Sequence, residues 1–496
     1  MSLINISNLT FSYDGSYGSI FENVSFRIDT SWKLGFTGRN GKGKTTFFNL
    51  LMEKYEYRGE IFSSVNFEYF TYEVPNKKKD TIDIINDICS DYAHWEIVRE
   101  LSLLEISEEV LYRPFETLSN GEQTKVLLSA LFIKENSFLL IDEPTNHLDV
   151  LARNIVSKYL KSKKGFILIS HDRAFLDICI DHILAINNTN IEVQQGNFSS
   201  WLENKEKIDQ FELSKNEKLK KDIKRLKESA KKSEKWADKA ESSKIGKGSL
   251  GIERNIDTRA YIGEQSRRMQ QRRKNLERRQ QKGIEEKSGL LKNIESFDKL
   301  KISQAQYHAK LLVSLKNIDI FYNEKISCNN ISFAIQDGDR IALCGKNGSG
   351  KSSIIKLICS EDIKYAGEFY KGKGLKISYV SQDTSFIKGD LRRFILENDL
   401  QESLFKTILQ KLNFSREQFE KDMATYSNGQ KKKVLIAKSL CEKAHLYVWD
   451  EPLNYIDIIS RIQIENLLLE YKPTILFVEH DSIFCKNIAT KKVSLI

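Results

Sequence analysis

The chain contains, at residues 38–45, the run Gly38-Arg39-Asn40-Gly41-Lys42-Gly43-Lys44-Thr45, which fits the phosphate-loop pattern G-x-x-x-x-G-K-[ST] in full. A short strand is predicted before it, at residues 32–37, and a helix after it, at residues 46–55. The glycines let backbone N–H groups wrap phosphate oxygens, Lys44 reaches the terminal phosphates, and Thr45 can ligate Mg²⁺. The helix N-terminus adds partial positive charge. This order predicts an α/β nucleotide-binding domain.

Two apolar runs further along the chain end in polar side chains. Residues 138–141 predict a buried strand that ends in Asp142 and Glu143, and residues 166–170 predict a second strand that delivers His171. Asp142 suits a metal ion, and Glu143 is placed to orient or deprotonate the attacking water in phosphoryl transfer. A lone histidine at a strand edge is usually structural. Its position after the two carboxylates instead favours contact with the γ-phosphate.

The same constellation occurs a second time in the chain. A second phosphate loop runs from Gly345 to Ser352, and corresponding positions of the two copies are separated by between 307 and 310 residues. The matched pairs are Tyr13 and Tyr322, Lys44 and Lys351, Tyr72 and Gln382, Ser119 and Ser427, Asp142 and Asp450, Glu143 and Glu451, and His171 and His480. Two fused copies of one domain explain a register kept this closely. Because both glutamates are present, both sites are expected to hydrolyse the nucleotide.

Two further runs point to a family. Leu118-Ser119-Asn120-Gly121-Glu122-Gln123 precedes the Asp-Glu strand, and Pro144-Thr145-Asn146-His147-Leu148-Asp149 follows it. Together they resemble the signature and the distal loop of ATP-binding-cassette ATPases. The resemblance implies that Ser119 and Gly121 contact the γ-phosphate of ATP bound to the opposite domain, that Tyr13 stacks on adenine, and that Asp149 couples the two sites.

The resemblance also implies that each phosphate loop is closed by the signature of the other domain. One site would combine Lys44, Asp142, Glu143 and His171 with Ser427 and Gly429; the other would combine Lys351, Asp450, Glu451 and His480 with Ser119 and Gly121. ATP and Mg²⁺ are the expected cofactors. The expected metal ligands are Thr45, Asp142, Ser352, Gln382 and Asp450. The expected nucleotide contacts are Tyr13, Gly38, Asn40, Gly41, Gly43, Lys44, Thr45, Thr46, Ser119 and Gly121 in the first copy, and Tyr322, Gly345, Asn347, Gly348, Gly350, Lys351, Ser352, Ser353, Gln382, Ser427 and Gly429 in the second.

The two copies differ at some of these positions. Tyr72 stands where the family usually has a glutamine that helps hold Mg²⁺ and water, whereas the second copy has Gln382. In the second signature, Tyr426 replaces leucine, and Gln430 and Lys431 replace the Glu-Gln pair. We therefore expect two sites that are not equivalent.

The segment between the copies carries the basic excess of the chain. Residues 203–301 hold 29 Lys and Arg against 18 Asp and Glu, a net charge of +11, whereas the whole chain carries +9. The flanking regions therefore sum to about −2, and the connector is the part that favours a nucleic-acid partner. The alternative is a solvated, charged helical spacer. The excess of one sign and a local cluster of arginines at residues 267–279 favour RNA contact, since arginine suits phosphates and base stacking.

The pattern of the connector predicts a helical hairpin. Apolar residues recur at a 4-3-4 spacing from Leu219 to Ala230, and at heptad positions from Met269 to Phe297 on the return arm. Glycine-rich sequence between them predicts an irregular tip near residues 241–263. Each arm is expected to span about 35–40 residues, hence about 50–60 Å. The domains are predicted as two tandem phosphate-loop ATPases, residues 1–200 and 306–496, joined by a basic hairpin at 201–305.

Composition excludes several classes of protein. No apolar run approaches the ~20 residues that a membrane span needs, and residues 1–5 do not begin a signal peptide. The seven cysteines are scattered, which argues against a disulfide framework or a zinc site and favours core thiols in a cytoplasmic protein.

Tandem cassettes with a basic hairpin resemble the F subfamily of ATP-binding-cassette proteins, and the run Glu451-Pro-Leu-Asn-Tyr-Ile-Asp457 resembles its bacterial antibiotic-resistance group. That resemblance implies a monomer that binds the bacterial 70S ribosome at 23S rRNA and the E-site and P-site tRNA region, with no membrane or DNA partner. It would dislodge pleuromutilins, lincosamides and streptogramin A in an ATP-dependent way. Two alternatives remain open: a general translation factor of the same family, and the ATPase subunit of a drug exporter.

Overall fold

The structure is a computed structural model of the 496-residue chain. It describes residues 2–13, 18–72, 74–145, 148–187, 189–242, 271, 274–275, 278–279, 282, 300–322, 325–346, 348–359 and 363–495. The chain divides into two compact units. One comprises Met1–Trp201 with Phe297–Ile496, and the other comprises Leu202–Ser296. Nearly all of the predicted hairpin tip and most of the predicted return arm lie outside the described residues.

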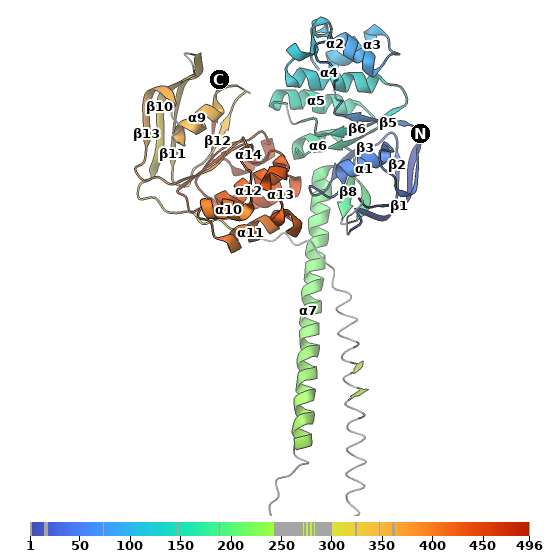
Figure 1. Cartoon of the computed structure of the whole chain (residues 1–496), viewed down its shortest axis with the longest axis vertical. Coiled ribbons are helices and arrows are strands. Elements are labelled where there is room, and N and C mark those ends of the chain that lie inside the picture. The colour runs from blue at the N-terminus through green and yellow to red at the C-terminus, as the bar shows by residue number, and fades with distance from the viewer. Residues whose placement is uncertain are drawn as a thin grey trace, which may run out of the picture. The chain divides into compact units, whose positions relative to one another are not determined.

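The first ATPase domain is built from both strands and helices (Figure 1). Its strands are β1 (Leu3–Phe11), β2 (Phe21–Asp29), β3 (Lys33–Thr37), β4 (Arg58–Phe62), β5 (Asn66–Phe70), β6 (Ser137–Asp142), β7 (Phe166–Ile169), β8 (His182–Asn187) and β9 (Asn190–Gln195). Its helices are α1 (Lys44–Leu51), α2 (Thr81–Ile88), α3 (His94–Leu103), α4 (Asn120–Ile133), α5 (Val150–Ser162) and α6 (Arg173–Cys179), with short 3₁₀ turns at Glu108–Tyr112 and Phe115–Thr117.

The strands of this domain form two sheets. The larger has the order β5-β6-β7-β3-β8-β9, in which every neighbouring pair is parallel except β8 and β9. Its central strands are buried over nearly their whole length, as parallel strands covered on both faces must be. The smaller sheet, β2-β1-β4, is antiparallel. Phe47 of α1 contacts both Phe21 of β2 and Phe36 of β3, so α1 joins the two sheets in one apolar core.

The second domain repeats this arrangement, which confirms the predicted tandem α/β fold. Its sheets have the orders β14-β15-β16-β12-β17 and β11-β10-β13. The strands are β10 (Leu311–Tyr322), β11 (Lys325–Gln336), β12 (Arg340–Cys344), β13 (Lys364–Lys371), β14 (Ile377–Val380), β15 (Leu446–Asp450), β16 (Ile475–Val478) and β17 (Lys491–Ser494). The helices are α9 (Lys351–Ile358), α10 (Leu391–Glu397), α11 (Glu402–Lys411), α12 (Asn428–Cys441), α13 (Ile458–Tyr471) and α14 (Ser482–Ile488), with 3₁₀ turns at Arg416–Glu420 and Met423–Thr425.

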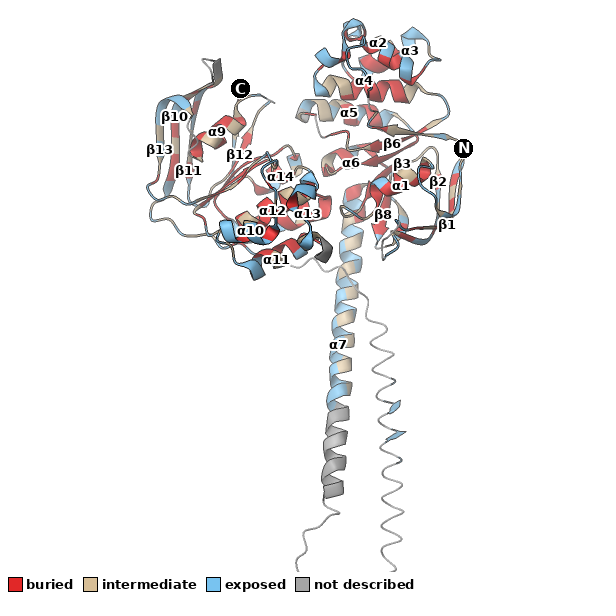
Figure 2. Ribbon diagram, viewed as in Figure 1, coloured by how far each residue is buried: buried red, intermediate tan, exposed pale blue. Residues whose placement is uncertain are grey.

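The connector begins as one long helix, α7 (Phe198–Ser242), of 45 residues. At 1.5 Å per residue this is about 67 Å, longer than the predicted arm. The helix starts within the predicted first domain, because Phe198 and Trp201 are buried and their rings lie 5.5 Å apart. Beyond Trp201, residues 202–228 are mostly exposed (Figure 2). At the other end of the connector, Leu300 and Ile302 are buried in the core of the second ATPase domain, ahead of the predicted start at 306.

The helices of the second domain offer a test of its apolar core. Phe405 of α11 is fully buried, whereas Leu396 of α10 is 80% exposed. Phe405→Ala is expected to lower the free energy of unfolding of this domain by about 3–5 kcal/mol, because it removes buried area and leaves a cavity. Leu396→Ala, the matched control, should change it by less than about 0.5 kcal/mol. Urea unfolding followed by fluorescence measures both, and equal effects would contradict the assigned core.

Candidate functional site

Each phosphate loop connects a central strand to the helix that follows it. Gly43 and Gly350 are the N-cap residues of α1 and α9 and lie in the left-handed region, with φ of 98° and 85°. A Cβ at Gly43 would lie 2.5 Å from the Ile20 side chain, and one at Gly350 would lie 2.8 Å from Cys328. Glycine is therefore required at both positions on two independent grounds.

The lysine of each phosphate loop points back into that loop. Lys44 Nζ donates to the Gly38 carbonyl at 2.7 Å, and Lys351 Nζ donates to the Gly345 carbonyl at 2.9 Å. Burial lowers the pKa of Lys44, while the carboxylates of Asp457, Glu143 and Asp142 oppose that shift. The two ammonium groups thus occupy the centre of each loop, where a polyphosphate would be expected to lie.

Side chains next to the loops were also predicted to contact nucleotide. The Tyr13 hydroxyl lies 2.9 Å from Thr46 Oγ1, and the residue as a whole is 42% exposed. In the second copy, Ser353 Oγ lies 3.2 Å from Ser327 Oγ. Gly41 and Gly348 have open space around them. Asn347 and the side chain of Tyr322 lie outside what the structure describes.

The predicted metal ligands lie together at the loops. Thr45 donates to Asp142 Oδ2 at 3.2 Å, and burial, the main influence, raises the Asp142 pKa. Burial likewise raises the pKa of Asp450, although a hydrogen bond from Ser352 opposes the shift. Asp450 Oδ1 is buried without a hydrogen-bond partner. A buried, unpartnered carboxylate oxygen beside a hydroxyl is a donor set that suits Mg²⁺, so these residues fit the metal.

The two glutamates have the same unusual backbone. Glu143 and Glu451 have φ of 49° and 46°, a conformation that costs a non-glycine residue about 1–2 kcal/mol. Their backbone N–H groups donate to Ile169 and Val478 on the neighbouring strands, at 2.9 and 3.0 Å. His171 Nε2 lies 3.3 Å from Glu143 Oε1. His480 Nε2 lies 3.4 Å from Glu451 Oε1. The structure therefore brings each predicted histidine to its predicted glutamate.

The surroundings of the two glutamates differ. Burial, with a further contribution from Asp142, raises the pKa of Glu143 to about 8. Burial would raise the pKa of Glu451, but the hydrogen bond and charge of His480, together with the charges of Lys432 and Lys351, outweigh it and lower that pKa. Gln382 and Asn454 donate to Glu451 Oε2, at 2.9 and 2.5 Å. Gln382, the residue replaced by Tyr72 in the first copy, is thus a direct hydrogen-bond donor to the second glutamate.

Both signatures are helix caps. Ser119 is the N-cap of α4 and forms a capping box with Glu122, and Ser427 is the N-cap of α12 and forms one with Gln430. The glutamine that made the second signature less regular therefore accepts the same backbone hydrogen bond as the glutamate of the first. Each cap places a helix N-terminus, and its partial positive charge, at the signature.

Residues of opposite domains meet at both loops. Asn40 Nδ2 of the first loop donates to the Tyr455 carbonyl at 3.0 Å, and a Cβ on Gly429 would lie 2.4 Å from that same carbonyl. At the second loop, a cavity of about 440 Å³ is lined by Asn120 of the first signature together with Lys351, Ser352, Gln382, Glu451 and His480. The predicted pairing of each loop with the other domain's signature stays a prediction.

Sequence reasoning missed several polar residues. Tyr69 donates to Asp142 Oδ2 at 3.2 Å. Lys432 is 2% exposed and donates to the carbonyls of Ser381 and Asp450, and burial lowers its pKa to about 8. Lys433 forms a buried ion pair with Asp457 at 2.8 Å. For the two lysines, the available signal in the sequence was the basic run 431–433 next to the signature. Such a run resembles an exposed helix face.

Comparison with known proteins identifies the class. A family model described as "ABC transporter" matches residues 21–146 and 328–454. The chain belongs to this family, and it carries the ATPase domain twice. ABC ATPase domains bind ATP, normally with Mg²⁺.

The individual relatives are ABC-F proteins. The chain is 30% identical to the ATP-binding protein Uup of Buchnera aphidicola over 515 residues, covering 99% of this chain and 80% of Uup. It is 23% identical to ABC transporter F family member 2 of Arabidopsis thaliana, covering 99% and 76%. It is 24% identical to the ribosome protection protein VmlR of Bacillus subtilis, covering 99% and 86%.

The fold is shared with a solved structure of low sequence identity. It is similar to the archaeal ribosome recycling factor aABCE1, solved in complex with the ribosomal stalk protein aP1, with a TM-score of 0.62 and 17% identity over 98% of this chain and 87% of that one. In the described part of the chain, no helix has the length and apolar character to cross a membrane.

Two glycines of the second loop provide a matched test of its geometry. Gly348 and Gly350 share a left-handed φ, but only a Cβ at Gly350 meets a neighbour. Gly350→Ala should weaken ATP binding at this site more than about tenfold, because strain and a steric clash add. Gly348→Ala should weaken it about fivefold, the cost of strain alone at about 1 kcal/mol. Fluorescent-nucleotide titration in a Lys44→Ala background measures this site. Equal losses would show that the Cys328 contact plays no part.

Proposed function

We propose that the protein is a cytoplasmic ABC-F ATPase that binds the bacterial ribosome as a monomer and hydrolyses ATP at two composite sites. The proposed domains are the ATPases at 1–200 and 306–496 and the basic connector at 201–305. The observation that carries the proposal is full-length similarity: relatives match 99% of the chain, connector included, and one of them is a ribosome protection protein. The net charge of +11 on residues 203–301 supports an RNA partner for the connector.

Each site would use residues of both domains. Bound Mg²⁺ would supply charge neutralisation at the phosphates, held by Thr45 and Asp142 in one site and by Ser352, Gln382 and Asp450 in the other. Glu143 and Glu451 would orient and deprotonate water, with His171 and His480 beside them. The signature helices would direct their N-termini toward the γ-phosphate, from Ser427 and Gly429 onto the first site and from Ser119 and Gly121 onto the second.

Closure around ATP would favour ribosome binding, and hydrolysis would favour release, as in a two-state switch biased by the γ-phosphate. The double variant Glu143→Gln with Glu451→Gln puts a carboxamide near each histidine and removes both bases. It is expected to stay on ribosomes when ATP is present. Pelleting through a sucrose cushion measures the bound fraction, and ADP in place of ATP is the control. Normal release of the double variant would contradict the assignment of the bases.

We propose further that the protein protects the peptidyl-transferase centre from pleuromutilins, lincosamides and streptogramin A. The support is the similarity to VmlR and the resemblance of residues 451–457 to the resistance group. The ATP-bound form would enter the tRNA exit site, and the hairpin tip would reach 23S rRNA or the P-site tRNA near the drug.

Shortening the predicted tip, residues 241–263, tests this role. The variant is expected to keep its ATPase rate, because these residues lie outside both ATPase domains, and to lose rescue of drug-inhibited translation in a cell-free system. Rescue that persists after the deletion would remove the tip from the mechanism. A wild-type protein that binds ribosomes without rescuing drug-inhibited translation would instead be a general translation factor of this family.

A further inference from the structure

Arg153 lies in the first turn of α5, just after the distal loop of the first domain, and it has partners in both domains. Its Nε donates to the Leu148 carbonyl at 3.0 Å and its Nη2 to the Thr145 carbonyl at 3.2 Å. Its Nη1 donates to Asp172 Oδ2 at 3.1 Å and to the backbone carbonyl of His480 at 3.3 Å. These four bonds use three of its nitrogens, and the side chain is only 15% exposed.

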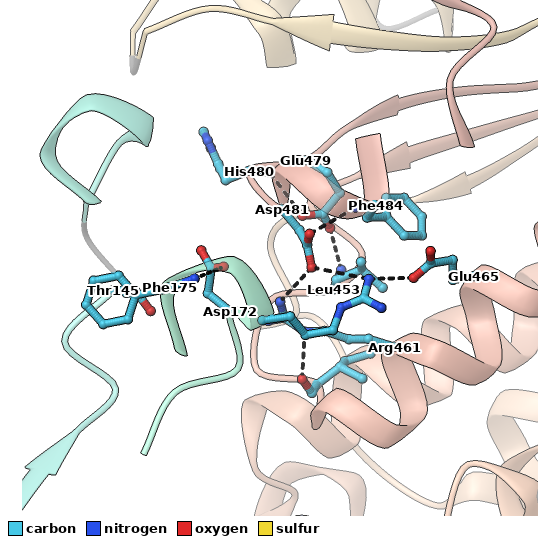
Figure 3. A network of polar contacts seen from close by, with 12 residues as sticks. Thr145, Asp172, Phe175, Leu453, Arg461, Glu465, Glu479, His480, Asp481 and Phe484 are labelled. Carbon is cyan, nitrogen blue, oxygen red and sulfur yellow. Dashed lines mark hydrogen bonds and ion pairs between the residues drawn. The ribbon is translucent and has the colours of Figure 1, made fainter. Parts of the chain in front are cut away.

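The acceptors of Arg153 include parts of both sites. Thr145 and Leu148 belong to the distal loop, and Asp172 follows His171, the histidine beside Glu143. His480 is the histidine beside Glu451, and Arg153 also lines the cavity that contains both. In the network drawn in Figure 3, Thr145 and Asp172 come from the first domain, and His480 and Asp481 come from the second. Arg153 donates to Thr145 and Asp172 of the first domain and to the His480 carbonyl of the second.

The corresponding arginine of the second domain makes the bonds within its own domain. Arg461 Nε donates to the Ile456 carbonyl at 2.9 Å, and its Nη1 lies 3.8 Å from Asp481 Oδ2. These contacts match those of Arg153 with Leu148 and Asp172. Holding the distal loop is thus the shared role. Arg461 also acts by its charge on Glu143 and His171 of the first site, whereas Arg153 donates a hydrogen bond to the His480 backbone of the second.

The interface next to this bond is not symmetric. Arg173 donates to Glu465 of the second domain at 2.5 Å in a buried ion pair. The equivalent positions on the other side are Ser482 and Ser157, which line a small cavity of about 40 Å³ together with Arg153 and His480. Small side chains there leave the Arg153 bond as a direct polar link between α5 and the His480 backbone.

We infer that Arg153 is a positioning residue for the second ATP site: it fixes the backbone of His480 and thereby the imidazole beside Glu451. The inference rests on the proposed ATP hydrolysis. It concerns the turnover step, because Arg153 acts through the histidine that lies beside Glu451, the proposed base. ATP affinity, which the phosphate loop provides, should change little.

The test isolates each site in the full-length protein. Glu143→Gln leaves the second site to hydrolyse ATP, and Glu451→Gln leaves the first. Adding Arg153→Met is expected to lower kcat about tenfold in the Glu143→Gln background and less than about twofold in the Glu451→Gln background, with KM within about twofold in both. Arg153→Lys should lose as much, because lysine lacks the Nε and Nη2 donors to Leu148 and Thr145 that hold the side chain in place.

Arg173→Gln is the matched interface variant, because it removes another guanidinium that crosses between the domains. If the site-selective loss belongs to Arg153, Arg173→Gln will not reproduce it. Equal losses from Arg153→Met in both backgrounds, full recovery with Arg153→Lys, or the same selectivity from Arg173→Gln would each overturn the inference while ATP hydrolysis itself stands. Absence of hydrolysis in both single-glutamate backgrounds would overturn the proposed function and this inference together.

Discussion

The candidate sites depend on one backbone hydrogen bond in each domain, from the glutamate N–H to the last residue of the adjacent parallel strand. In the first domain Glu143 donates to Ile169, and in the second Glu451 donates to Val478. This bond comes at the end of the β6–β7 and β15–β16 ladders, where the strands run parallel and deliver their C-terminal residues to the same edge. It holds the glutamates in their left-handed conformation and brings each one to the histidine that follows the neighbouring strand. Strain of this kind persists only where surrounding structure enforces it.

The two sites share this frame but differ in their polar environment. Glu451 receives hydrogen bonds from Gln382 and Asn454, and its pKa is lowered; Glu143 Oε1 is buried without a hydrogen bond, and its pKa is raised. In the first site, the expected metal ligand Asp142 accepts a hydrogen bond from Tyr69. Tyr69 lies on β5, three residues before Tyr72, which stands where the family usually has a glutamine. A duplicated fold has therefore kept its backbone geometry while the side chains around each water-activating position have diverged.

Much of the fold and site follows from local sequence. The phosphate loops, the acid pairs and the signature caps are each set by residues within a few positions of one another, so spacing alone locates them. The predicted ends of helices were less accurate. The helix predicted at residues 46–55 is α1, which begins at Lys44 because Gly43 caps it. It ends at Leu51, shortly before Glu53 adopts a left-handed conformation. Lys432 and Arg153 could not have been found, because burial among partners far along the chain distinguishes them from ordinary surface charges. The tip of the hairpin remains a prediction from sequence.

The first turn of α7 is part of the first ATPase domain, and this has a consequence for the connector. Phe198 and Trp201 anchor its first turn among the buried residues of the first ATPase domain, and the helix then continues without interruption to Ser242. Because these two aromatic side chains belong at once to the domain core and to the first turn of α7, a substitution that opens a cavity beneath them would loosen the start of this helix as well as the domain.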